Sequence, residues 1–225
     1  MTEAAAPIRV WDLPTRIFHW ALAALVAFSF ATGQVGGDWM PWHLRSGYAV
    51  LTLLLFRIAW GFAGSRTARF AHFLRGWRAV ARYARATIAG RPPPFAGHNP
   101  LGGWVVVAML AALAFQAATG LFSSDEIATQ GPLANKVSDA IVSRMSSLHS
   151  LDKWVLVALV AAHVAAIATY RLAWNVRLVG PMIHGRMRAP PGVEEPPRRP
   201  AWLALAALCA CAAAVWYLVE IYPMR

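Results

Sequence analysis

Five long apolar runs dominate the chain and limit the folds that are open to it. They cover about residues 13–33, 42–62, 100–122, 147–171 and 201–221. A helix of roughly 20 apolar residues crosses the hydrocarbon core of a bilayer, where only helices and closed barrels satisfy their own backbone. Hydrophobic residues make up 58% of the 225 residues, and only 14% are charged. The sequence therefore predicts an all-α integral membrane protein with five transmembrane helices.

The positive charge of the chain lies in two of the loops between these runs. The formal net charge is +11, which in a soluble protein would suggest nucleic acid, but here it is concentrated in loops between apolar runs. Residues 65–91 carry seven arginines and no acidic residue, with Trp77 and Tyr83 among them. This composition predicts an amphipathic helix at the membrane surface, in contact with anionic membrane lipid rather than nucleic acid.

The same charges predict the orientation of the chain. The loop after the second run and the loop after the fourth run are rich in arginine, whereas the first and third loops are close to neutral. Basic loops stay in the cytoplasm. We therefore expect a multi-pass protein of the bacterial inner membrane, with a cytoplasmic N-terminus and a periplasmic C-terminus.

Capping residues and prolines mark the boundaries of the runs. Asp12 precedes the first run, and Asn99 with Pro100 opens the third, as an N-cap and a first helical residue do. Residues 189–200 are rich in proline and predict an extended linker. The expected domains are a four-helix unit over 1–188, this linker over 189–200, and an extra C-terminal helix over 201–225.

Two histidines lie on one face of the fourth run. His149 and His163 are 14 positions apart, which places them about 21 Å apart along a helix and within roughly 40° of each other around it. An ionisable residue inside a membrane span is a functional hypothesis by default. Each imidazole is either an axial ligand of a haem or a partner in an interhelical hydrogen bond, and this helix alone does not separate the two.

Two further histidines complete pairs at matching depths. His19 lies near the cytoplasmic end of the first run and His163 in the cytoplasmic half of the fourth, while His43 and His149 lie at the outer ends of the second and fourth runs. A haem iron held by two imidazoles needs one ligand from each of two facing helices at a common level. The pairs His19/His163 and His43/His149 therefore favour iron ligation, and thus two haems, over simple hydrogen bonding.

The remaining candidates have simpler interpretations. His72, His98 and His184 fall in or beside cytoplasmic loops and are expected to face solvent or lipid headgroups. Arg45 and Arg66 are candidates for neutralising haem propionates. Cys209 and Cys211 point about 200° apart on a helix, so they cannot pair. No C-x-x-C-H motif occurs, which excludes covalent haem attachment, and no motif predicts a catalytic residue.

The motifs around these histidines resemble those of the bacterial cytochrome b561 family, which includes the cytochrome b subunits of membrane-bound nickel-iron hydrogenases. They are VWDLPTRIFHW (10–20), WHLRSGY (42–48), RIAWGFAGSRTARF (57–70), GHNPLGGW (97–104) and LVAAHVAA (159–166). The resemblance extends over about 1–188 and implies a four-helix transmembrane bundle with two haem b groups. The family's ligand histidines match His19, His43, His149 and His163.

The resemblance also implies a function in electron transfer. Family members exchange electrons with a quinone and with a periplasmic redox partner such as a c-type cytochrome, a hydrogenase or a dehydrogenase. A subunit of such an assembly is the main interpretation, rather than a free-standing enzyme. One alternative is a single-chain quinone reductase that oxidises a small species such as superoxide. The other is a haem-free membrane anchor or transport protein.

Overall fold

Helices form most of the molecule. The computed structural model describes residues 7–188, 194, 195, 197 and 199–224. Within these residues, five helices are long and apolar enough to cross a membrane. They are α1 (Leu13–Val35), α2 (Met40–Ala63), α5 (Pro100–Leu121), α6 (Asp139–Trp174) and α8 (Ala201–Trp216), the last continued by a π-helical turn, η4 (Tyr217–Ile221). The predicted all-α membrane protein with five spans is thereby confirmed.

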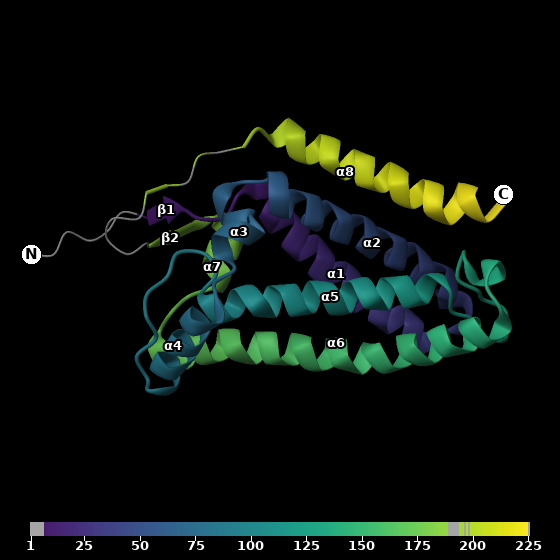
Figure 1. Cartoon of the computed structure of the whole chain (residues 1–225), viewed down its shortest axis with the longest axis horizontal. Helices are drawn as coiled ribbons and strands as arrows, with labels where there is room; N and C mark the ends of the chain where they lie inside the picture. Colours follow the sequence, from purple (N-terminus) through teal and green to yellow (C-terminus); the bar gives the residue numbers. More distant parts are fainter. Residues whose placement is uncertain (1–6, 189–193, 196, 198, 225) are drawn as a thin grey trace, which may run out of the picture. The chain divides into compact units, whose positions relative to one another are not determined.

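Short elements connect the spans. They are the strands β1 (Pro7–Arg9) and β2 (Arg186–Arg188), the helices α3 (Phe70–Phe73), α4 (Trp77–Ile88) and α7 (Val179–His184), and the 3-10 turns η1 (Gly37–Trp39), η2 (Arg66–Ala68), η3 (Ala134–Lys136) and η5 (Tyr222–Met224). The two strands pair antiparallel, with Ile8 opposite Met187 (Figure 1). The sequence analysis did not predict this small sheet.

Both predicted caps are present. The backbone N–H of Thr15 donates to Asp12 Oδ1 at 2.9 Å, and that of Gly102 donates to Asn99 Oδ1 at 2.6 Å. Each side-chain oxygen satisfies a first-turn N–H that has no partner within its helix. These caps fix where α1 and α5 begin.

Two predicted boundaries were wrong. α6 begins at Asp139, eight positions before the expected Ser147, because its first two turns mix apolar residues with Asp139, Arg144 and two serines, and hydropathy does not reveal them. The arginine-rich segment is not one helix, since the backbone is extended at Leu74 and at Gly76, between α3 and α4. Thr67 Oγ1 donates to the carbonyl of Val10 and Phe73 is buried. These tertiary contacts fix the chain before α4 in a turn.

The chain forms two compact units. Unit 1 comprises residues up to 17, 58–108 and 162–204, and unit 2 comprises 18–57, 109–161 and 205–225. The predicted linker over 189–200 falls largely outside the described residues, and the predicted domain boundaries stay a prediction.

Four helices share one apolar core within unit 2. Val50 and Leu54 of α2 pack with Leu113 of α5 and Leu156 of α6, and residues 22, 25 and 26 of α1 lie against them. A second cluster joins α8 to this unit through Val215. Its other members are Leu121, Leu133 and Val219, with Tyr48, Leu51, Phe122 and Leu218 around them. The first cluster has the packing expected of a four-helix bundle.

Unit 1 holds α4 through polar and aromatic contacts. The hydroxyl of Tyr83 is 2.8 Å from that of Tyr170, to which Asn99 Nδ2 donates at 3.2 Å. Tyr83 and Val80 are buried, whereas Trp77 at the start of α4 is 76% exposed. α4 therefore has a buried face and an arginine-bearing exposed face, as an amphipathic surface helix has.

Candidate functional site

His43 and His149 lie together in unit 2. The centroids of their rings are 6.1 Å apart, and the ring planes are nearly perpendicular, at 88°. With metal–nitrogen bonds of about 2 Å and ring centres about 1 Å beyond the nitrogens, an iron between two imidazoles separates the ring centres by roughly 6 Å. The two residues of the predicted outer pair therefore have a spacing that suits a shared iron.

A backbone carbonyl of a neighbouring helix orients each of these rings. His43 Nδ1 donates to the carbonyl oxygen of Ser29 on α1 at 2.8 Å, and His149 Nδ1 donates to that of Gln116 on α5 at 2.9 Å. A carbonyl can only accept, so Nδ1 carries the proton in both rings and Nε2 keeps its lone pair. This arrangement is typical of metal-binding histidines, whose second nitrogen is held by a hydrogen bond.

Glycines on the neighbouring helices make room for both imidazoles. A Cβ atom on Gly33 would lie 2.7 Å from His43 Nδ1, and one on Gly120 would lie 2.9 Å from His149 Cε1. Neither separation is compatible with a real side chain unless the ring moves. By contrast, a Cβ built on Gly47, one turn after His43 on α2, would meet no atom within 4 Å beyond the adjoining residues and backbone of its own helix. The helix surface beside Gly47 is therefore open.

The other predicted pair is divided between the two units. His19 belongs to unit 2, where it is half-buried and its ring centre lies 5.0 Å from that of Trp20. His163 belongs to unit 1 and is also half-buried on α6. The pairing of His19 with His163 stays a prediction.

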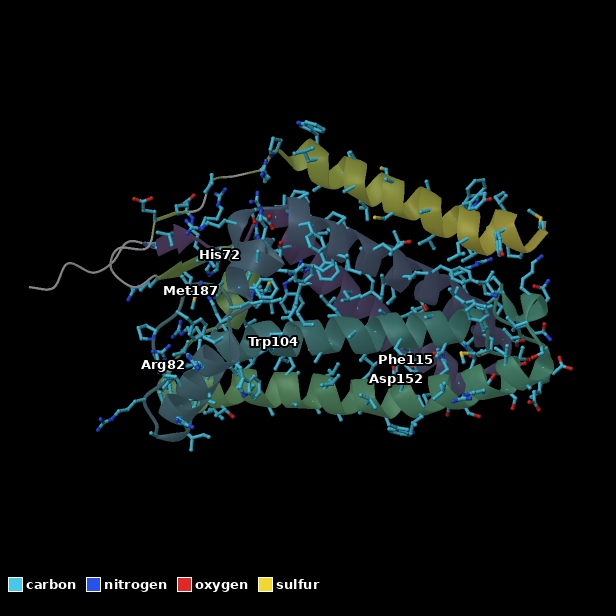
Figure 2. All side chains as sticks on the ribbon, in the orientation of Figure 1. His72, Arg82, Trp104, Phe115, Asp152 and Met187 are labelled. Carbon is cyan, nitrogen blue, oxygen red and sulfur yellow. The ribbon has the colours of Figure 1, made fainter. Side chains whose placement is uncertain are left out.

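Asp152 and Lys153 follow His149 by three and four residues on α6 and have different surroundings. The structure shows Lys153 Nζ donating to Gln34 Oε1 at 3.0 Å, whereas Asp152 is 8% exposed and its Oδ2 atom has no hydrogen-bond partner. Figure 2 labels Asp152 on α6 and Phe115 on α5. A carboxylate is therefore buried one turn from His149.

The three remaining histidines, His72, His98 and His184, belong to unit 1, whereas His43 and His149 belong to unit 2. Burial, and after it the charges of Arg66 and Arg75, lower the pKa of His72 below its usual value. His184 Nδ1 accepts from the backbone N–H of Arg186. His98 is not solvated as expected, because it packs against Trp11 and Phe73 with ring-centre distances of 4.7 and 4.5 Å.

The candidate propionate partners, Arg45 and Arg66, are both exposed. Arg45 lies over the ring of Trp42 at 5.1 Å. Nothing in their contacts brings either residue to His43 or His149, so a role in binding propionates stays a prediction for both.

Sequence reasoning missed the residues that surround the two rings. Ser29 and Gln116 accept from the rings through their backbone oxygens, which no side-chain motif reveals, and the side-chain nitrogen of Gln116 also lies 3.2 Å from His149 Nε2. Gly33 and Gly120 stand among other small residues of apolar runs. The sequence feature that could have identified Gly33 and Gly120 is their position near the outer ends of their helices, at the level predicted for His43 and His149.

Comparison with known proteins gives a consistent result. The prokaryotic cytochrome b561 family matches residues 10–185. A probable Ni/Fe-hydrogenase B-type cytochrome subunit of Azotobacter chroococcum mcd 1 is 24% identical, over 79% of this chain and 87% of its own length. A probable Ni/Fe-hydrogenase 1 B-type cytochrome subunit of Escherichia coli (strain K12) is 24% identical, over 78% and 88%. No solved structure matches the chain.

Proposed function

The chain belongs to the prokaryotic cytochrome b561 family, and from this we propose that it is a membrane-bound b-type cytochrome with two haem groups. In this proposal it passes electrons between a periplasmic redox partner and the membrane quinone pool. His43 and His149 bind the iron of the outer haem, and His19 and His163 bind that of the inner haem.

The contact between His43 and His149 is the observation that supports this function best. Two imidazoles from two helices have ring centres 6.1 Å apart, and a carbonyl accepts from each Nδ1, so that each Nε2 keeps an acceptor lone pair. That of His149 accepts from the side-chain nitrogen of Gln116 at 3.2 Å. Gly33 and Gly120 leave room for both rings, which simple hydrogen bonds between helices would not require. Haem supplies one-electron chemistry when it is bound there.

Ligation by two imidazoles decides the kind of chemistry. An iron with both axial positions filled has no open site for oxygen or substrate, so outer-sphere electron transfer is the activity that remains. The chain's own contribution is to bind and orient each haem and to exclude water from it. We therefore assign no catalytic residue.

The relatives suggest the class of partner. Those compared above carry the names of probable Ni/Fe-hydrogenase B-type cytochrome subunits. By analogy, we propose a hydrogenase or a similar periplasmic oxidoreductase as the electron donor, docked at the outer face near His43 and His149. The quinone is the proposed acceptor.

The experiment is a count of haems in purified variants. The wild-type protein should give a reduced-minus-oxidised spectrum with b-type bands and two haems per chain. His43→Ala and His149→Ala should each lose one haem and keep the other, because each change removes one of two axial ligands. Pyridine haemochrome assay and the spectrum of each variant measure this.

His72→Ala serves as the control, because His72 lies on the short helix α3 of unit 1, outside the spans, and its loss should leave both haems in place. A wild-type chain without b-type bands would refute the proposed function. If His43→Ala and His149→Ala kept both haems, the assignment of the outer ligands would be wrong.

A further inference from the structure

Asp152 is a buried ionisable group, as is Arg57, and the proposed function leaves it unexplained. It lies in unit 2 on α6, three residues after His149, which is about 4.5 Å along the helix axis. Asp152 and Leu156 are the two buried residues of α6, and Leu156 packs in the core shared by four helices. The carboxyl group therefore faces the interior of unit 2, on the side of α6 from which His149 reaches His43.

Among the described residues, no cation forms an ion pair with Asp152. Its Oδ2 atom is buried without a donor, and the neighbouring Lys153 donates instead to Gln34. The first apolar cluster, which contains Leu156, offers no hydrogen-bond donor. A carboxylate in such a place is costly unless a positive charge accompanies it. A buried polar group without a hydrogen-bond partner needs an explanation, and a bound cationic group is one.

We propose that Asp152 is the counter-charge of the oxidised outer haem, and that it sets the reduction potential of that haem. The iron and porphyrin ring together carry one positive charge when oxidised and none after uptake of one electron. A carboxylate one helical turn from the axial ligand stabilises the oxidised form through Coulomb attraction, which is strong at a site of low dielectric. Asp152 thereby lowers the potential of the outer haem.

This inference rests on the proposed ligation by His43 and His149, and it explains a direction of electron flow. A lower potential at the outer haem makes it a better electron donor to the inner haem and the quinone beyond it. The burial of Asp152 keeps water from screening this charge, whereas an exposed carboxylate on the same helix is screened.

The test is a spectroelectrochemical titration of the purified full-length protein in nanodiscs. Asp152→Asn removes the charge and keeps the shape. At a fixed applied potential near the midpoint, the ratio of reduced to oxidised outer haem should rise about tenfold in this variant, which corresponds to 59 mV for a one-electron couple. The outer haem is identified as the component that His43→Ala removes.

Two further variants are the matched controls. Asp152→Glu keeps the charge and should restore a potential close to that of the wild type. Asp139→Asn removes an exposed carboxylate from the first turn of the same helix and should leave the potential unchanged.

The outcomes separate this inference from the proposed function. An unchanged outer potential in Asp152→Asn, with both haems present, would overturn the inference and leave the b-type cytochrome intact. Loss of the outer haem from Asp152→Asn but not from Asp152→Glu supports it, because the site then needs the charge. Loss from both variants alike contradicts it, because the site then needs the shape of aspartate. Absence of b-type bands in the wild type would instead refute the proposed function.

Discussion

α5 approaches the ring of His149 most closely at Gly120. A Cβ atom there would lie 2.9 Å from Cε1 and 3.2 Å from Nδ1 of that ring, and Nδ1 donates to the carbonyl of Gln116 one turn earlier on α5. The absence of a side chain at residue 120 is thus a condition for the hydrogen bond that orients His149.

Gly120→Ala should weaken the outer haem site. The added methyl group pushes the ring away from Gln116, at a cost typical of overpacking, about 1–3 kcal/mol. We expect fewer outer haems per chain and normal inner haem content, measured by haem titration of the apoprotein.

Gly76→Ala is the control for this change, because its Cβ meets no atom within 4 Å and its φ angle of −59° suits alanine. Equal haem content in Gly120→Ala and the wild type would show that the ring has freedom that the structure does not indicate.

At the scale of elements, the loop between α5 and α6 has a compact turn of its own. Ser124 forms a β-bridge with Gln130, and between them Asp125 Oδ1 accepts from the backbone N–H groups of residues 127, 128 and 129, at 3.0, 3.0 and 2.8 Å. These amides, that of Thr129 foremost, lower the pKa of the Asp125 carboxyl to about 2 from its usual 3.8. The ionised carboxylate therefore stabilises the turn.

This turn should lose its order in acid. Because the pKa is lower in the folded turn, the stabilisation is complete above pH 3.8 and is lost as the pH falls through about 2. Amide hydrogen exchange of residues 127–129, corrected for intrinsic rates, should show less protection at the lower pH. Asp125 is exposed, so the effect stays local.

Asp125→Asn should make this protection independent of pH, since it keeps an acceptor oxygen but has no charge to lose. Glu126→Gln, which changes the exposed neighbour, should behave like the wild type. Constant protection in the wild-type chain across this range would show that the three hydrogen bonds do not depend on the charge.

For the whole molecule, we expect the asymmetry of positive charge to set the orientation of the five spans in the membrane. Arginines concentrate between α2 and α5 and again after α6, whereas the loop from α5 to α6 carries acidic and basic residues in similar number. Positively charged loops remain in the cytoplasm. An odd number of spans then puts the two ends of the chain on opposite sides.

Fusions to alkaline phosphatase, which is active only in the periplasm, test this orientation. A fusion after residue 225 and one after residue 124 should be active, and one after Arg91 should be inactive. Removal of residues 201–225 should leave the new C-terminus in the cytoplasm and the fusion inactive. An active fusion after Arg91 would invert the predicted orientation and place His43 and His149 at the cytoplasmic side.

The sequence alone determined those features that depend on a single segment. Apolar length set the five spans, because each helix satisfies its own backbone in lipid. Asp12 and Asn99 set two helix starts, because a cap acts within one turn. The depths of His43 and His149 followed from counting residues along their helices, which is why the proposed outer ligands could be chosen before their contact was seen.

Tertiary structure decided what depends on the rotation and approach of neighbouring helices. It selected the carbonyls of Ser29 and Gln116 as partners of the two rings, brought Gly120 against His149, and buried Asp152 while Lys153 reached Gln34. It also interrupted the arginine-rich segment before Gly76. Such contacts join residues distant in sequence, and a local pattern carries no record of which surfaces will meet.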